Sequence, residues 1–236
     1  MTTIIIPAHN EKDNLRDLVP QLTEIPKEFP VEIIVALSSD NSDDSETLAS
    51  EYPVKCVQCK KKGRAVQMNS AAKLAKEGIL VFLHADVTPP DTFISDISTA
   101  IQEGFDAGFF SYHFDKKSFF LQINAFFTAK DSIFTGGGDQ CLFIKKEVFD
   151  ALGGFDEKQV LMEDFEFFRR MKNNNVRYTI IKNDLIVSAR KYRNNSYMRI
   201  NLANFLLVIL FKCGYPAKKL KSLHDRLIKM PYQNNS

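Results

Sequence analysis

Residues 78–90, GILVFLHADVTPP, decide the fold of this chain. The five apolar residues 79–83 are too few to span a membrane and are typical of a strand buried on both faces. Thr88 and the two prolines after it cannot continue a sheet. Asp86 would therefore lie at the carboxyl end of a buried parallel strand, where open α/β sheets bind their ligands. There it could hold Mg²⁺ or Mn²⁺, or it could cap the turn or the helix that begins near Asp91.

Strand and helix patterns alternate before this stretch. Short apolar runs predict strands at 3–7, 31–37, 54–58 and 79–83, and helices with apolar residues at helical spacing separate them. Such units predict a parallel sheet with right-handed crossovers. The chain has neither a G-x-G-x-x-G pattern nor a Walker sequence, so the sequence does not indicate a dinucleotide fold or a P-loop.

The pattern changes after Pro90. Helices are predicted at 92–101, 118–130, 148–152 and 161–172, and strands at 107–114, 141–144, 176–181 and 185–188, with residues 136–140 as a flexible turn. We expect one domain over residues 1–192 and a helical C-terminal appendage over 193–236. The helix at 118–130 has one broad apolar face, which we expect in the core and which consists of Phe119, Phe120, Ile123, Phe126 and Phe127.

Composition bounds the function and the compartment. The 236 residues are 44% hydrophobic and 25% charged, and the net charge of +2 argues against a dedicated nucleic-acid binder. The N-terminus lacks a signal-peptide pattern, so we expect a cytoplasmic protein. Cys56 and Cys59 have no second pair at zinc-finger spacing, and we expect reduced thiols.

Residues 203–211 form an apolar run with Asn204 as its single polar residue. A membrane-spanning helix needs about 20 such residues, so this run cannot cross a bilayer. It could be a buried helix. It could also make a shallow, peripheral contact with the inner face of a membrane, because several Lys and Arg residues flank it.

Polar clusters follow the predicted strands at 8–11, 39–42, 63–64 and 84–86, and a parallel sheet brings them to one edge. Asp40 could accept hydrogen bonds from a base edge, and Arg64 could meet a phosphate or a base. Glu163 and Asp164 open a helix, whose macrodipole would keep carboxylates ionised. An ionised aspartate can abstract a hydroxyl proton, although Asp164 could also be an ordinary helix N-terminal acid.

The order of these motifs resembles a known family. Residues 4–11 (IIIPAHNE), 40–42 (DNS), 64–69 (RAVQMN), 82–86 (FLHAD), 138–140 (GDQ) and 162–164 (MED) are similar to a family 2 glycosyltransferase. The similarity covers about residues 3–192 and is greatest to the small bacterial subgroup of radical-SAM/selenodomain-associated transferases. It implies the GT-A fold, an α/β architecture with a Rossmann-like, mostly parallel central sheet flanked by helices.

The resemblance also implies an inverting transfer from a nucleotide diphosphate sugar, with Mg²⁺ or Mn²⁺ as cofactor. It assigns Asp164, beside Glu163, as general base and Asp86 as metal ligand. Asp139 and Gln140 would face the sugar or the acceptor. The residues implied in donor binding are Pro7, Ala8, Asn10, Glu11, Asp40, Arg64, His84, Ala85, Arg190 and Lys191. The acceptor could be lipid-linked or a soluble small molecule.

Two positions depart from the family pattern. Ser39 stands where the family often has a first aspartate, which puts a preference for uracil in question. His84 replaces the first aspartate of the D-x-D motif and leaves one carboxylate for the metal. These departures motivate a non-catalytic nucleotide-sugar-binding or scaffold protein as an alternative. A sugar-phosphate nucleotidyltransferase is a weaker one, because the chain has Pro7 to Asn10 where that class has a glycine-rich loop.

Overall fold

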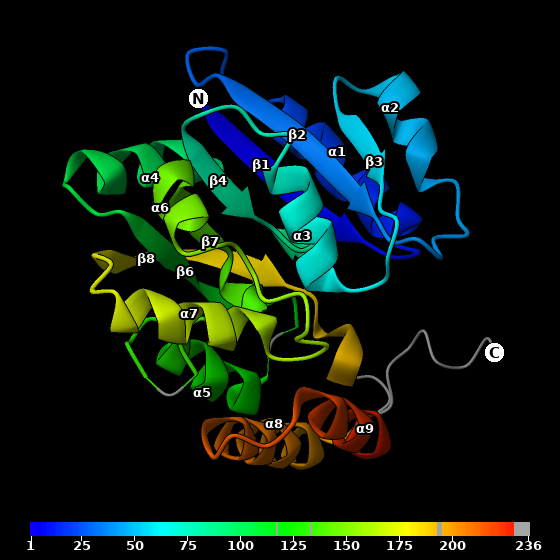
Figure 1. Ribbon diagram of the computed structural model, residues 1–236, viewed down its shortest axis with the longest axis vertical. Coiled ribbons are helices and arrows are strands. Elements are labelled where there is room, and N and C mark those ends of the chain that lie inside the picture. The colour runs from blue at the N-terminus through cyan, green and yellow to red at the C-terminus, as the bar shows by residue number, and fades with distance from the viewer. Residues whose placement is uncertain (117, 133, 193–194, 229–236) are drawn as a thin grey trace.

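The computed structural model describes residues 1–116, 118–132, 134–192 and 195–228. Among these residues, eight strands form one mixed sheet in the order β3-β2-β1-β4-β7-β6-β8-β5, with helices on both faces (Figure 1). The strands are β1 (Thr2–Ala8), β2 (Val31–Leu37), β3 (Lys55–Gln58), β4 (Ile79–Phe82), β5 (Val87–Thr88), β6 (Ala107–Phe114), β7 (Leu142–Lys145) and β8 (Tyr178–Val187).

The first half of the sheet is parallel, as the sequence predicts. β1 pairs with β2 and β4, so that Ile4 lies between Ile33 and Val81. Alternate residues of these strands enter two hydrophobic layers. One layer lies under α1 (Lys12–Thr23), α2 (Leu48–Glu51) and α4 (Phe93–Gln102), and the other under α3 (Arg64–Ala72), α6 (Lys146–Ala151) and α7 (Glu163–Asn173). Burial on both faces explains the continuous apolar runs.

The second half of the sheet is mixed, and two predictions about it are wrong. β7 runs antiparallel to β4 and β6, whereas β6 and β8 are parallel. The strands predicted at 176–181 and 185–188 are one strand, β8, because its pairing with β6 continues past an irregularity between Phe110 and Tyr112. Val87 and Thr88 do continue the sheet, as β5, because they pair with the end of β8 before the prolines begin.

The apolar face predicted for the core at 118–130 is exposed. In α5 (Phe119–Thr128), Phe119 is 72% exposed and Phe126 is 59% exposed, and Phe120, Ile123 and Phe127 are exposed as well. Leu121 is the buried residue of this helix. The structure joins α5 to the last part of β6 through Thr128, whose hydroxyl accepts a hydrogen bond from the Tyr112 backbone amide, and leaves these five apolar side chains exposed.

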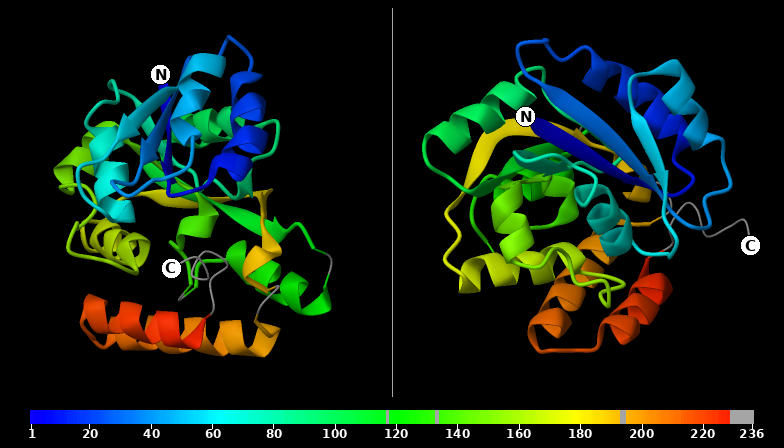
Figure 2. Two further views of the ribbon diagram at one scale, coloured as in Figure 1. Left: turned by 90° about the vertical axis from the view of Figure 1, so that its right-hand side faces the viewer. Right: turned by 45° about the horizontal axis from the view of Figure 1, so that its top comes forward.

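The C-terminal helices α8 (Tyr197–Lys212) and α9 (Ala217–Leu227) lie side by side at one end of the molecule (Figure 2). Leu207, Phe211 and Leu220 pack together against Met162 and Phe165 at the start of α7. One side of the helix over residues 203–211 is buried and the other side is exposed. The expectation of a buried helix is therefore confirmed for one side only. Among the described residues, no helix combines the length and apolarity needed to cross a bilayer.

Candidate active site

The loops after β1 and β2 are joined as the sequence predicts. Asn10 adopts a left-handed backbone conformation (φ 54°), and its backbone amide donates to the Asn41 side chain at 2.8 Å. In return the Asn10 side-chain oxygen accepts a hydrogen bond from the backbone amide of Ser42, also at 2.8 Å. Asparagine tolerates this conformation better than most residues. Asn10 therefore shapes the edge of the site through its backbone as well as its side chain.

Asp40 lies at this edge as an ionised acceptor. Lys62 is 2.7 Å from its carboxylate and Ser38 donates a hydrogen bond to it, which lowers the pKa of Asp40 to about 2. His9 lies 3.6 Å away. The predicted pocket residues Pro7 and Ala8 end β1, and Ala8 is buried. The carboxylate of Asp40 can accept hydrogen bonds from the edge of a base.

Arg190 links two acidic residues from different loops. It belongs to a 3-10 segment, η3 (Ala189–Tyr192), and its guanidinium donates to both oxygens of Glu11 at 3.0 and 2.9 Å. The same guanidinium is 3.1 Å from Asp86. Burial raises the pKa of Glu11 despite this partner. Arg190 thus places positive charge between Glu11, which is predicted to border the nucleoside, and Asp86, which is predicted to hold the metal.

Lys191, the next residue of η3, forms a second ionic group. Its ammonium is 2.9 Å from Asp139, and the His84 ring is 3.6 Å from the other oxygen of that carboxylate. Burial alone would raise the pKa of Asp139, but Lys191 and His84 hold it well below its usual range. His84, which replaces the first carboxylate of D-x-D, therefore contacts Asp139 across the site. Ala85, between His84 and Asp86, is buried.

Asp164 differs from the other carboxylates of the site. Burial, followed by the negative charge of neighbouring Glu163, raises its pKa to about 7. Arg64 is 3.1 Å from Glu163 and 3.8 Å from Asp164, which partly offsets this effect. The expectation that the helix macrodipole keeps Asp164 ionised is thus corrected: burial and a like charge outweigh the dipole. A carboxylate with this pKa can both accept and hold a proton near neutral pH.

The residues 136–140 are not the flexible turn that the sequence predicts. Residues Gly138–Gln140 form a 3-10 segment, η2, and Gly138 lies directly against the site. A Cβ atom at Gly138 would lie 2.4 Å from Cε1 of His84 and 2.6 Å from Oδ2 of Asp164. Only glycine leaves room for both side chains. Sequence reasoning missed this positioning role, although the glycine run next to Asp139 was a signal for close backbone approach.

The Gln140 side chain is turned into its own loop, which argues against the ligand-facing role that the resemblance implies. Its side chain is buried, accepts a hydrogen bond from the Gly136 backbone amide at 2.9 Å and donates one to the Thr128 carbonyl at 3.0 Å. Both ends of the amide are therefore engaged within the loop. Gln140 fixes the position of η2 and, through it, of Asp139.

The donor set at Asp86 fits a minimal metal site. Among the described residues, no group of three or more His, Cys, Asp or Glu side chains could hold an ion. Mg²⁺ and Mn²⁺ accept oxygen ligands, and Mg²⁺ commonly uses one or two carboxylates together with substrate phosphates and water. Asp86 can supply that carboxylate, with Glu11 nearby across Arg190.

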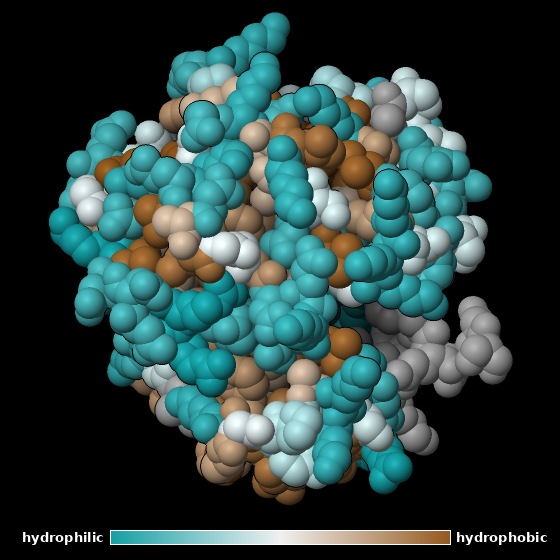
Figure 3. All heavy atoms as spheres, in the orientation of Figure 1, coloured by the Kyte–Doolittle hydropathy of each residue, from teal (hydrophilic) through white to brown (hydrophobic). Residues whose placement is uncertain are grey.

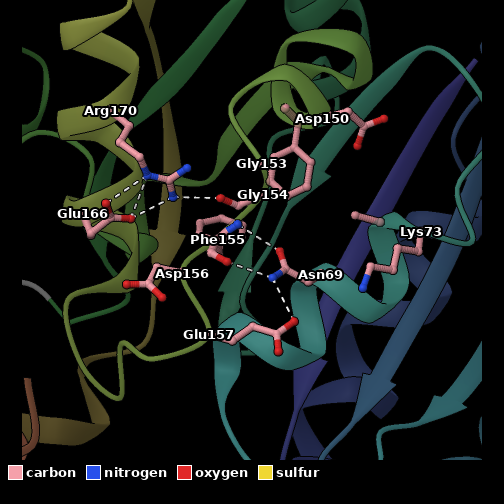
Figure 4. Close-up of a pocket in the computed structure, with 12 residues that line it drawn as sticks. Asn69, Lys73, Asp150, Gly153, Gly154, Phe155, Asp156, Glu157, Glu166 and Arg170 are labelled. Atoms are coloured by element: carbon pink, nitrogen blue, oxygen red, sulfur yellow. Dashed lines mark hydrogen bonds and ion pairs between the residues drawn. The ribbon is translucent and has the colours of Figure 1, made fainter.

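A separate hollow of about 600 Å³ lies between α3 and the loop that precedes α7 (Figure 4). Several of its polar groups are engaged with one another: Asn69 holds the backbone of Phe155, and Arg170 binds Glu166 and the carbonyls of Leu152 and Gly154. Residues other than those predicted for the site line it. We interpret it as the structural anchor of this loop.

Comparison with curated proteins gives two partial relatives. The chain is 31% identical over 110 residues to a protein of Pyrococcus furiosus named dolichol-phosphate mannosyltransferase, covering 44% of this chain and 31% of that protein. It is also 31% identical over 112 residues to a Serratia proteamaculans protein named undecaprenyl-phosphate 4-deoxy-4-formamido-L-arabinose transferase, covering 44% and 34%. The chain thus spans about a third of the length of these relatives.

Solved structures share the fold. TarS of S. aureus (residues 1–349) matches with a TM-score of 0.65 and 16% identity, over 89% of this chain and 65% of that one. The mannosyltransferase PcManGT of Pyrobaculum calidifontis, solved with GDP-Man and Mn²⁺, matches with a TM-score of 0.67 and 18% identity, over 96% and 69%. At these identities the likeness establishes the GT-A fold, which confirms the predicted architecture.

The sequence model of the family described as "Glycosyl transferase family 2" matches residues 3–153, more than half of the chain. This chain belongs to glycosyl transferase family 2.

Proposed function

We propose that this chain transfers a sugar from a nucleotide diphosphate donor to an acceptor hydroxyl, with inversion at the anomeric carbon. The observation that carries the proposal is the convergence of three carboxylates and three cations at one edge of the sheet, together with an Asp164 whose pKa is raised to about 7. These charged residues are Asp86, Asp139, Asp164, Arg64, Arg190 and Lys191.

In this proposal the donor lies across the carboxyl ends of β1, β2 and β4. Pro7, Ala8, Asn10 and Glu11 border the nucleoside, and Asp40 accepts hydrogen bonds from the base. Arg190 and Lys191 would bind the diphosphate, because they are cations held at the site by carboxylates. Asp86 would hold Mg²⁺ or Mn²⁺, and when bound, the cation neutralises charge on the diphosphate.

Asp164 would act as the general base. Its carboxylate takes the proton of the acceptor hydroxyl while the hydroxyl oxygen bonds to the anomeric carbon and the bond from that carbon to the diphosphate breaks. A single displacement of this kind inverts the anomeric centre. Arg190 and Lys191 stabilise the charge that develops on the leaving diphosphate. Asp139, held by Lys191 and His84, would face the sugar.

Two classes of acceptor fit this mechanism. Both curated relatives have lipid-phosphate names, which favours a lipid-linked acceptor over a soluble one. Four expectations from the sequence stay predictions. They are the resemblance to the radical-SAM-associated subgroup, the cytoplasmic location, the peripheral membrane contact through 203–211, and the domain limits 1–192 and 193–236.

Calorimetry with UDP, GDP, dTDP, ADP and CDP, with and without Mn²⁺, tests the donor site. We expect one diphosphate to bind, more tightly with Mn²⁺, and the Asp86→Asn variant to lose the effect of the metal. Asp164→Asn should keep nucleotide affinity and lose transfer by about 10² to 10⁴-fold. Full transfer by Asp164→Asn would refute the base assignment. Nucleotide binding without turnover for any acceptor would favour the non-catalytic alternative, for which Ser39 and His84 are the motivating departures.

A further inference from the structure

Two helices present apolar faces to solvent. On α5, Phe119, Phe120, Ile123, Phe126 and Phe127 are all exposed and recur at helical spacing. On α8, the exposed apolar residues are Met198 (70%), Leu202 (69%), Phe205, Leu206 and Ile209, again at helical spacing. Each set forms one stripe opposite the buried side of its helix. Isolated apolar residues on a surface are ordinary, but ten on two helices indicate an interaction surface.

The two stripes belong to one surface. We name it the α5–α8 face, and it consists of these ten residues. Asn124 of α5 donates to Asn201 of α8 at 2.9 Å, so the helices are in direct contact. The Phe120 ring stacks on Tyr197 with centroids 5.0 Å apart. In Figure 3, apolar side chains reach the surface at the lower end of the molecule, where Figure 1 places α8.

The charge around this face is mostly positive. The segments 115–131 and 195–227, which contain α5, α8 and α9, include nine Lys or Arg residues and three Asp residues, although the whole chain is nearly neutral. The Lys130 ammonium lies 4.1 Å from the centre of the Phe126 ring, at the border of the face. Arg199 and Lys212 are exposed on α8.

We propose that the α5–α8 face docks on an anionic lipid surface. Apolar side chains bordered by Lys and Arg gain from burial at the lipid interface and from attraction to anionic headgroups. A second copy of the chain is a poorer partner, because it would bring two basic borders together. The proposal goes beyond sugar transfer and does not depend on it.

The α5–α8 face is also connected to the active site. Asn124 donates to the hydroxyl of Tyr192 at 3.3 Å, and Tyr192 follows Lys191 in η3. The Tyr197 hydroxyl donates to the same Asn124 at 2.9 Å. A lipid surface on this face would therefore lie next to the segment that supplies Arg190 and Lys191, where a lipid-linked acceptor could approach.

Co-sedimentation with vesicles, in the absence of donor, tests the proposal. Wild-type protein should bind vesicles of phosphatidylcholine with phosphatidylglycerol, bind poorly to phosphatidylcholine alone, and dissociate as salt rises. The combined substitution Phe119→Ser, Phe126→Ser and Leu202→Ser should reduce partitioning by about tenfold or more, because it removes much of the buried apolar area. Leu74→Ser and Val160→Ser, exposed apolar residues outside the face, are the matched controls and should bind as wild type.

A second variant tests the proposal independently of whether the first variant folds. Lys130→Glu with Lys212→Glu leaves the apolar residues intact and should abolish the preference for anionic vesicles; circular dichroism verifies that each variant is folded. Equal partitioning of wild type and both variants would overturn the proposal. So would a concentration-dependent dimer that Phe126→Ser dissolves, without vesicle binding, since a second copy would then cover the face. Asp164→Asn should bind vesicles normally, which separates this test from that of sugar transfer.

Discussion

Asp164 provides the clearest prediction for a single residue. Its pKa is raised to about 7, so its base form is lost as the pH falls below that value. If Asp164 is the general base, kcat/KM should rise about tenfold per pH unit below pH 7 and level off above it, because kcat/KM reports the free enzyme. Steady-state kinetics across this range provide the measurement. A flat profile would contradict the assignment.

Two neighbours of Asp164 serve as opposing controls for that profile. Glu163→Gln removes the like charge that raises the pKa of Asp164 and should move the midpoint to lower pH. Arg64→Gln removes a stabilising cation and should move it to higher pH. Midpoints that do not move in opposite directions would show that another group controls the rate.

Gly138 allows a second prediction with a neighbour as control. Gly138→Ala would place a methyl group 2.6 Å from Oδ2 of Asp164 and should reduce kcat by about 10²-fold, since small displacements of reacting groups are that costly. Gly137→Ala has no contact closer than 3.7 Å and should retain near wild-type kcat. Equal activity of the two variants would show that the loop moves away from Asp164 freely.

The sequence located the strand ends that carry the candidate site residues, but not the contacts between these residues. Strand ends could be located from apolar runs, which placed Asp40 and Asp86 at one edge. The contact between Arg190 and Glu11 joins residues 179 positions apart, and no local pattern encodes it. The Gln140 contacts left no sign in the sequence for the same reason, because its buried amide forms hydrogen bonds with the surrounding backbone.

At the scale of the element, α3 secures the ends of two strands. The buried Gln67 side chain donates to the carbonyls of Ala8 and Ala36 at 2.7 Å each. Gln67→Met keeps the size of the side chain but removes both hydrogen bonds, although the Ala8 carbonyl keeps its bond from the Ser38 backbone amide. The loss of two buried hydrogen bonds should lower the free energy of unfolding by about 1 to 3 kcal/mol. Urea denaturation measures the change. The exposed Gln102→Met on α4 is the control and should stay within about 0.5 kcal/mol.

The elements that the sequence predicted correctly are those whose burial can be recognised within one short stretch of the chain. A strand with helices on both faces is apolar at every position, so β1, β2 and β4 were evident. α5 was predicted as a helix correctly and as core wrongly, because an apolar stripe shows which side of a helix is apolar but not what covers it. β5 was missed because its two residues pair only with the distant end of β8.

Across the whole molecule, the C-terminal helices support the helix that carries Asp164. Phe211 of α8 packs with Leu220 of α9 against Met162 and Phe165, which flank Glu163 and Asp164 in the chain. This packing indicates that the start of α7 depends on α8 and α9, whereas the sequence predicts that residues 1–192 form a domain of their own. Measurements of stability and of activity together distinguish the two.

Phe211→Ala should lower the free energy of unfolding by about 3 kcal/mol, since it empties a buried aromatic site, and should also reduce kcat by loosening the start of α7. Phe205→Ala, on the exposed side of the same helix, should change both far less and is the matched control. Urea denaturation and steady-state kinetics measure the two effects. If Phe211→Ala lost stability but kept full kcat, the site would be independent of α8 and α9. A chain truncated after residue 192 with unchanged stability and activity would then establish the separate domain.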